Sequence, residues 1–265
     1  MKTALITGAS MGIGATFAQT LAARSTNLIL VARSQDKLDQ LAEQLRTQHQ
    51  VQVETIVQDL TAPNAATIVF NRVRELGLTV DLLVNNAGFG EYGAFADIDR
   101  QRQLDMVQLN VSATVDLTHQ YLQEMRSRRS GSIINLASTA AFQGMPYLAV
   151  YAATKAFVLS FTEALIEENR EFGVRILALC PGPTETNFFD EADFPPNLAN
   201  VAARAATDKK TVVTQALDAL EKGQAIVVPG QIYNQLFASS YRLLPREWLS
   251  SMIGKLLRPQ PKSPD

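Results

Sequence analysis

The sequence reads TALITGASMGIG from Thr3 to Gly14, and this stretch decides the fold. Five mostly apolar residues, typical of a buried strand, lead through a glycine-rich turn directly into a helical pattern over residues 12–24. Glycines allow a tight turn and let backbone N–H groups approach a phosphate, while a helix N-terminus adds its dipole and unpaired donors. Tight strand–helix packing alone would also use glycines. The position of the turn after the first strand favours a phosphate-binding role.

Strands and helices keep alternating along the rest of the chain. Short runs rich in β-branched residues and leucine predict strands at residues 3–7, 27–32, 51–57, 81–85, 132–137, 174–180 and 225–228. Amphipathic patterns predict helices at roughly residues 12–24, 35–48, 63–77, 99–127, 149–172 and 209–222. We therefore predict an α/β fold, a doubly wound (Rossmann-type) parallel seven-stranded sheet with helices on both faces, in a single domain. Residues 183–207 are predicted to form a long loop of the kind that serves as a lid or binding segment.

Composition excludes several function classes. The chain has 265 residues and a net charge of −2, which gives no basic footprint for nucleic acid. Its single cysteine and two histidines predict neither an internal disulfide nor a metal site. No apolar run reaches the length of about 18 residues that a membrane span requires, and the first glycine comes too early for a signal peptide. We expect a soluble cytoplasmic protein.

The glycine-rich turn also has a second interpretation. Gly8-Ala9-Ser10-Met11-Gly12 fits Gly-x-Ser-x-Gly, the nucleophile elbow of serine hydrolases, which is likewise a strand-to-helix turn. That elbow needs earlier strands and a histidine late in the chain. Here only seven residues precede Gly8, and His49 and His119 lie in the first half. The hydrolase interpretation is therefore disfavoured.

Further motifs follow in order after later strands. Asn86-Ala87-Gly88 follows the fourth strand, Asn110 lies within a predicted helix, and Ser138 follows the fifth strand. Tyr151 and Lys155 are four residues apart, so they share one face of the next helix. Alone this pair could be ordinary surface residues, but the whole set in this order closely resembles the single-domain short-chain dehydrogenase/reductase family. The resemblance covers residues 1 to about 230, and it predicts a dinucleotide-binding and catalytic domain over 1–230 with a C-terminal extension over 231–265.

The resemblance implies a catalytic set of four residues. Tyr151 would be the general acid for carbonyl reduction and the base for alcohol oxidation, and Ser138 would position the substrate oxygen. A free phenol has a pKa of about 10, so Lys155 would lower the pKa of Tyr151 and would also hold the nicotinamide ribose. Asn110 would kink its helix and hold a water that relays protons to Lys155; a helix-interior asparagine without a role is the alternative.

The resemblance also implies a set of cofactor-binding residues. The glycine-rich turn would cradle the pyrophosphate, Asp59 would bind the adenine unless it only caps the segment after it, and the backbone after the sixth strand would receive the nicotinamide amide. The full set is Gly8, Ser10, Met11, Gly12, Ile13, Gly14, Arg33, Ser34, Asp59, Leu60, Asn86, Ala87, Gly88, Tyr151, Lys155, Pro181, Gly182, Thr184 and Thr186. Ala137 and Thr184 depart from the usual family pattern at positions that are not catalytic.

The end of the second strand predicts the cofactor. An acidic residue about 20 positions after the glycines would bind a ribose 2′-hydroxyl and repel a 2′-phosphate. Ala32 occupies that position, and the following Arg33 and Ser34 offer a guanidinium and a hydroxyl to a phosphate. Met11 replaces a second basic residue that NADP-using relatives often carry. We predict NADP(H), with NAD as the alternative.

The substrate side is predicted to be apolar. Substrate contacts are expected from residues 89–98, 139–147 and 183–207, beyond the carboxyl ends of the strands. Their apolar members are Phe89, Tyr92, Phe95, Phe142, Met145, Tyr147, Phe188, Phe189 and Phe194, which either contact substrate or pack the lid. We predict an oxidoreductase that transfers a hydride between NADP(H) and a carbonyl or secondary alcohol of a hydrophobic small molecule. The alternatives are an NAD-dependent alcohol dehydrogenase and a non-catalytic dinucleotide sensor.

The C-terminal residues carry a separate signal. Residues 240–265 hold five basic and two acidic residues, and large apolar residues recur there at helical spacing. We predict one or two helices over 241–257, joined near Pro245, whose apolar face centred on Trp248 packs on the body near the substrate opening or on a neighbouring subunit. A homodimer or homotetramer is expected. Weak contact of the basic face with a membrane surface is the alternative.

Overall fold

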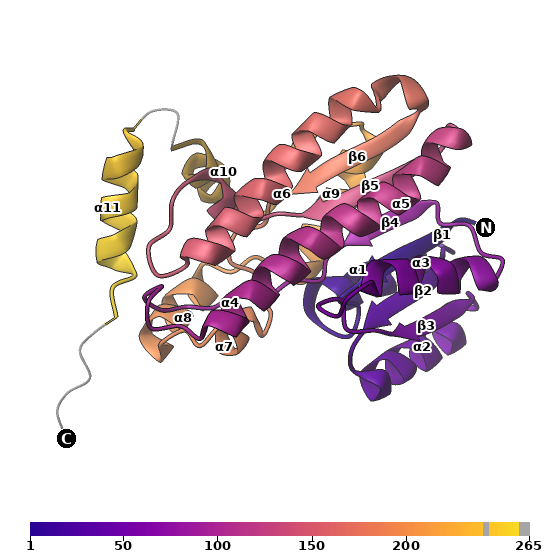
Figure 1. The fold of residues 1–265 in the computed structure, drawn as a ribbon, viewed down its shortest axis with the longest axis horizontal. Helices are drawn as coiled ribbons and strands as arrows, with labels where there is room; N and C mark the ends of the chain where they lie inside the picture. The colour runs from indigo at the N-terminus through magenta and orange to yellow at the C-terminus, as the bar shows by residue number, and fades with distance from the viewer. Residues whose placement is uncertain (241–243, 260–265) are drawn as a thin grey trace.

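The computed structural model describes residues 1–240 and 244–259 as one α/β body around a single sheet (Figure 1). All neighbouring strands in the sheet are parallel, and their order is β3-β2-β1-β4-β5-β6-β7. The strands are β1 (Thr3–Thr7), β2 (Asn27–Ala32), β3 (Val53–Val57), β4 (Leu82–Asn85), β5 (Gly131–Leu136), β6 (Val174–Leu179) and β7 (Ile226–Val227). This confirms the predicted seven-stranded parallel sheet. The strand order reverses between β1 and β4, which is where such sheets bind ligands.

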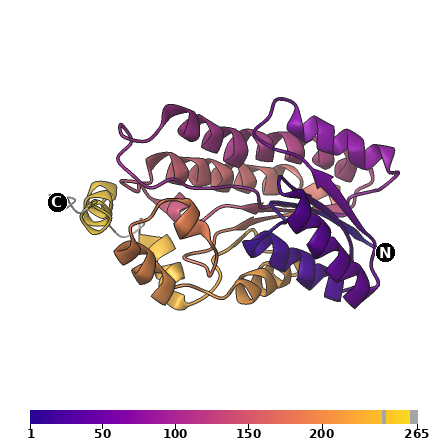
Figure 2. The same cartoon turned by 90° about the horizontal axis from the view of Figure 1, so that it is seen from below.

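Helices cover both faces of the sheet, as Figure 2 shows from below. One face carries α1 (Gly12–Ala23), α2 (Gln35–His49) and α9 (Lys209–Glu221); the other carries α3 (Ala65–Glu75), α5 (Ala113–Ser127) and α6 (Ala149–Glu168). The pleat of β1 explains the two layers, because Ala4 and Ile6 face the first set of helices and Leu5 faces the second. Strands buried on both faces account for the nearly continuous apolar runs in the sequence.

Two predicted segments differ in detail. The helix predicted over 99–127 is α4 (Arg100–Val107), a π-helical turn (Gln108–Ser112) and α5 in succession. The predicted loop over 183–207 contains α7 (Phe188–Glu191) and α8 (Pro196–Arg204). Single 3₁₀ turns also form at Thr139–Phe142 and Arg170–Phe172. Such short turns hold too few residues to show a periodic pattern in the sequence.

The C-terminal segment forms α10 (Ile232–Ser239) and α11 (Arg246–Leu256), and Pro245 is the N-cap of α11. The predicted helix at 241–243 lies outside the described residues. Leu249 and Ile253 of α11 are buried against the body. The Tyr92 hydroxyl donates to Leu257 O at 2.6 Å. Trp248 does not pack on the body, because it is 68% exposed in this single chain; packing on a neighbouring subunit stays a prediction. Helix α11 contacts the rest of the protein through the side that carries Leu249 and Ile253, so the adjoining side with Trp248 stays exposed.

Among the described helices, α6 is long and apolar enough by length and composition to cross a membrane. Helix α6 packs on β5 and β6, and it carries Tyr151 and Lys155. About a third (33%) of its most apolar window is buried within the described chain.

A buried polar network crosses the sheet just below its carboxyl edge. Asn85 Nδ2 donates to Asn135 Oδ1 at 2.8 Å and to Thr118 Oγ1 at 2.9 Å, and Asn135 Nδ2 donates to Thr162 Oγ1 at 3.0 Å. The network ties β4 and β5 to α5 and α6. Because these groups are shielded from water, each needs its partner.

Asn135→Ala should therefore destabilise the fold. The change leaves Asn85 Nδ2 short of a partner and Thr162 without its donor, and an unsatisfied buried group costs about 1–3 kcal/mol. We expect urea unfolding to show a loss of at least about 2 kcal/mol. Gln48→Ala on the exposed side of α2 is the control, with a change within about 0.5 kcal/mol. Equal stability of both variants would contradict the structural role of the network.

Candidate active site

The glycine-rich turn is fixed by contacts with the end of β4. The Thr7 hydroxyl accepts from the backbone N–H groups of Asn86 and Ala87, both at 3.0 Å. Asn86 Nδ2 in turn donates to Thr7 O at 2.8 Å and to Gly8 O at 3.2 Å. Gly8 has φ +64°, and a Cβ on Gly14 would lie 2.3 Å from Gly8 O. Both positions therefore require glycine, as the sequence indicated.

A cavity of about 250 Å³ opens beside this turn. Its lining includes, of the predicted cofactor-binding residues, Gly8, Ser10, Met11, Gly12, Ile13, Arg33, Ser34, Asp59, Leu60, Asn86, Ala87, Gly88 and Thr186. Leu109, Asn187 and Glu191 also line it and were not predicted as cofactor-binding residues; Phe89, predicted on the substrate side, lines it as well. Phe89 follows Gly88 and Leu109 precedes Asn110. Their position next to these motif residues is the feature of the sequence that could have placed them in the cavity.

Both basic and acidic side chains line this cavity. Arg33 and Ser34 are exposed at the end of β2, next to the buried Ala32. Burial by itself would raise the pKa of Asp59, but hydrogen bonds from the Thr61 backbone and hydroxyl, helped by the Arg33 charge, hold that pKa below its ordinary value. Asp59 thus caps the turn that follows it, at 2.9 Å from Thr61 N, and also faces the cavity. The glycine cradle suits the phosphates of a dinucleotide, and the Arg33 guanidinium adds a positive charge at the same cavity.

Ser138, Tyr151 and Lys155 meet beyond the carboxyl end of β5. All three line a second cavity of about 420 Å³. Ser138 Oγ accepts from Ala140 N at 3.1 Å, and Lys155 Nζ donates to Leu136 O at 2.7 Å. Lys155 Nζ is 5.9 Å from the centre of the Tyr151 ring. The structure thus brings together the three residues that the sequence placed on β5 and α6.

The pKa of Tyr151 differs from the expectation. Burial of the phenol raises the pKa of Tyr151 to about 12, against a smaller lowering by a hydrogen bond with Ser138. We predicted that Lys155 lowers the pKa of Tyr151. This was wrong for this structure, because burial of the phenol dominates and the Lys155 amine donates to the Leu136 carbonyl. Burial also lowers the pKa of Lys155 to about 8, opposed by Cys180. The phenol therefore keeps its proton at neutral pH.

Asn110 lies in the π turn and joins that turn to the loop after β4. Phe89 N donates to Asn110 Oδ1 at 3.1 Å, and Asn110 Nδ2 donates to Phe89 O at 3.0 Å and to Thr154 Oγ1 at 3.0 Å. A π turn widens the helix by one residue, which agrees with the local distortion expected here. The predicted water-holding role of Asn110 stays a prediction.

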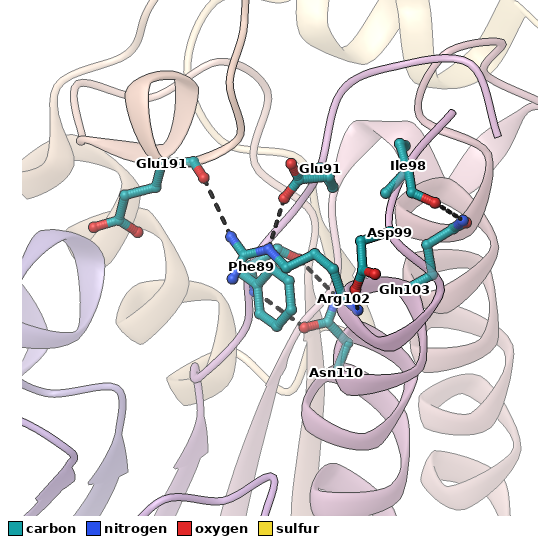
Figure 3. Close-up of polar contacts among 8 residues, drawn as sticks. All are labelled: Phe89, Glu91, Ile98, Asp99, Arg102, Gln103, Asn110 and Glu191. Atoms are coloured by element: carbon teal, nitrogen blue, oxygen red, sulfur yellow. Dashed lines mark hydrogen bonds and ion pairs between the residues drawn. The ribbon is translucent and has the colours of Figure 1, made fainter. Parts of the chain in front are cut away.

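Arg102 connects the same loop to α7 (Figure 3). Its Nε donates to Glu91 Oε2 at 2.7 Å, and its guanidinium carbon lies 4.2 Å from the centre of the Phe89 ring. Its Nη2 reaches the backbone oxygen of Glu191 at 3.4 Å. Helix α7 begins with Phe188, whose ring is 5.1 Å from that of Tyr151. Arg102 therefore helps to position the segment that covers the phenol.

The larger cavity is almost entirely apolar. Among the described residues that line it, Lys155 is the one charged side chain. From the predicted substrate segments it takes Met145, Phe188, Phe189 and Phe194, whereas Phe95 is 64% exposed and outside it. The predicted segment 183–207 also contributes Leu198, Val201, Ala202 and Ala205. Residues from outside the predicted segments complete this part of the lining: Tyr233, Asn234, Phe237, Leu256 and Leu257. Pro181, Gly182 and Thr184 line this cavity, and Thr186 lines both.

Comparison with known proteins agrees with this geometry. Residues 2–194 match the family model of short chain dehydrogenases. An uncharacterised oxidoreductase of Staphylococcus saprophyticus is 32% identical over 221 residues, which cover 83% of this chain and 92% of that protein.

Two solved structures extend the comparison over the whole chain. A short-chain dehydrogenase from Sphingobium yanoikuyae in complex with NADPH has a TM-score of 0.82 at 28% identity, covering 100% of this chain and 99% of the other. The bulky-bulky ketone specific alcohol dehydrogenase from Comamonas testosteroni has a TM-score of 0.77 at 30% identity, covering 100% and 97%. With its sheet order, its glycine-rich turn and these matches, the chain belongs to the short-chain dehydrogenase family of oxidoreductases.

Proposed function

We propose that the chain is an NADP(H)-dependent oxidoreductase that interconverts bulky hydrophobic ketones and secondary alcohols. One observation carries the proposal: Ser138, Tyr151 and Lys155 line an apolar cavity that shares Ile13, Asn86, Gly88 and Thr186 with the glycine-walled cavity. A dinucleotide and an apolar substrate could therefore meet at the phenol.

The catalytic residues divide the proton chemistry of carbonyl reduction. The nicotinamide cofactor, when bound, supplies the hydride. The Ser138 hydroxyl donates a hydrogen bond to the carbonyl oxygen, and Tyr151 transfers its proton to that oxygen as negative charge develops there. A phenol with a pKa of about 12 is protonated throughout the neutral range, as an acid must be. The ammonium of Lys155 opposes the build-up of negative charge on the phenol oxygen that is left behind.

The preference for NADP(H) rests on the end of β2. Ala32 offers no carboxylate to a ribose 2′-hydroxyl, whereas the exposed Arg33 and Ser34 line the cavity where a 2′-phosphate would lie. The NADPH complex of the Sphingobium relative supports the same choice. Residues of the glycine-rich turn, with Asp59, Asn86 and Lys155, would hold the remainder of the cofactor.

The substrate class follows from the larger cavity. Its volume of about 420 Å³ is within the range of small-molecule sites. Its walls carry phenylalanine, leucine and valine with no carboxylate or guanidinium. A cationic substrate would therefore lose its hydration without gaining a partner, and an anionic one would find Lys155 alone. The ketone-specific alcohol dehydrogenase among the similar structures supports an uncharged, bulky ketone.

Tyr151→Phe should remove catalysis while leaving cofactor binding in place. The variant keeps the ring against Phe188 but loses the transferable proton, and losing a positioned general acid costs about 10²–10⁴ in rate. Turnover of a screened panel of apolar ketones with NADPH, together with the Kd for NADPH, measures both effects. Tyr121→Phe is the matched control, because the Tyr121 hydroxyl is buried without a partner away from the cavities. Near-normal turnover by Tyr151→Phe would refute the assignment.

Exchange of two residues at the end of β2 should reverse cofactor preference. Ala32→Asp with Arg33→Ile removes the guanidinium and adds a carboxylate that repels a 2′-phosphate. Losing a hydrogen bond to a charged group costs about 1.5–3 kcal/mol, so NADPH should bind roughly tenfold or more weakly and NADH more tightly. Titrations of both cofactors check this, with Arg72→Ile on α3 as the control. A parent protein that binds NADH at least as tightly as NADPH would contradict the proposal.

The pH dependence of reduction should follow Lys155. Its pKa is lowered to about 8, so the ammonium is present below that pH and is lost above it. Because kcat/KM for NADPH reports groups of the free enzyme, this quantity should be level near neutrality and fall as pH rises through about 8. Lys155→Met should remove the falling limb along with most activity. A parent profile that stays level to about pH 10 would count against a role for the ammonium.

A further inference from the structure

Exposed apolar side chains surround the opening of the larger cavity. Val201 on α8, Phe237 on α10 and Leu256 on α11 all line that cavity, yet they are 58%, 36% and 67% exposed. These three residues, which we call the cavity rim, come from three different helices near the C-terminal end of the described chain. An apolar surface in water is unfavourable unless it serves a contact. We therefore expect the rim to contact an apolar partner at the opening of the cavity.

Helix α11 extends the rim into a longer stripe. Trp248, Met252 and Leu256 follow one another at intervals of four residues, so they lie on one side of the helix. They are 68%, 61% and 67% exposed, whereas Leu249 and Ile253 on the adjoining side are buried. Figures 1 and 2 show α11 as the outermost helix on the side of the molecule where the C-terminus lies. We call Trp248, Met252 and Leu256 the α11 stripe.

Basic residues accompany the α11 stripe. Arg246, Lys255 and Arg258 are exposed, and Glu247 is the one acidic residue within α11. Lys255 is seven residues after Trp248, which places it on the same side of the helix. The chain as a whole has a net charge of −2, so this basic excess is local. Tryptophan and leucine combined with lysine and arginine are typical of helices that lie in a membrane interface.

We propose that the α11 stripe and the cavity rim dock on an anionic lipid surface, so that the opening of the larger cavity faces the membrane. Apolar side chains enter the boundary of the acyl chains while the basic groups contact anionic headgroups. Symmetrical contact with a second copy would bring the basic residues beside both α11 stripes together, with one Glu247 in each helix to offset them. The docking does not depend on the proposed reaction, although it would let ketones dissolved in lipid reach Ser138 and Tyr151 directly.

The test uses the full-length protein and vesicles of defined composition. Trp248 is the single tryptophan of the chain, so its emission reports α11 alone. Vesicles of phosphatidylcholine containing phosphatidylserine should shift that emission to the blue and should sediment the protein. Vesicles of phosphatidylcholine alone should bind it more weakly, and added salt should weaken binding to the anionic vesicles.

Paired variants separate charge from apolar contact. Lys255→Glu with Arg258→Glu should weaken binding to anionic vesicles roughly tenfold or more, whereas Lys37→Glu with Lys222→Glu makes the same change of charge on exposed positions elsewhere. Met252→Glu should weaken binding, and Ile68→Glu at an exposed apolar position of α3 should not. Thermal unfolding and NADPH affinity of each variant show that it is folded, independently of ketone turnover.

Three results would overturn the proposal. The first is a parent protein that binds neither kind of vesicle. The second is equal loss of binding in the control variants, which would reflect overall charge instead of the α11 stripe. The third is a concentration-dependent dimer in which Trp248 is protected from a soluble quencher without lipid, because a second copy would then cover the stripe. Failure of ketone reduction with intact vesicle binding would count against the proposed function alone.

Discussion

The contact between the first turn and the end of β4 governs the rest of the molecule. Asn86 donates two hydrogen bonds to Thr7, at 3.0 and 2.8 Å, and Gly14 lies so close to Gly8 O that no larger residue fits. In the parallel pair of β1 and β4, Ile6 lies opposite Val84, so the turn after β1 and the loop after β4 begin side by side. Because this is the point where the strand order reverses, closing the two segments together also directs the N-terminus of α1 into the cavity between them. The π turn, α6 and the loop after β6 are assembled around that opening.

Burial gives the two titrating residues of the site opposite tendencies. Desolvation raises the pKa of Tyr151 and lowers that of Lys155, because each residue is driven toward its neutral form. The environment that keeps the phenol protonated therefore also weakens the ammonium that would stabilise its anion. In the reaction that we propose, reduction would use the first effect, while oxidation would have to begin from an anion that the site disfavours. The apolar cover supplied by Phe188 contributes to this balance, since its ring lies against the phenol.

The sequence predicted best the parts that depend on local pattern. Alternating apolar runs gave the sheet and its flanking helices, and the motifs after β1, β4 and β5 meet because parallel strands share one carboxyl edge. The division of the helix at 99–127 could not be predicted, since Asn110 acts through Phe89 and Thr154, which a periodic pattern does not reveal. The pKa of Tyr151 and the exposure of Trp248 depend on which surfaces are finally covered. Those are properties of tertiary packing, as is the contribution of α10 to the cavity.

The pairing of Asn110 with Phe89 has a consequence for the energetics of ligand capture. The side-chain amide accepts from and donates to the backbone of one residue, as a neighbouring strand would. The loop after β4 is thereby ordered when the chain folds, and the conformational entropy of that segment is lost at folding and not at each encounter with a ligand. A wall that is preorganised in this way makes association more favourable. It also allows product to leave without the loop having to refold between turnovers.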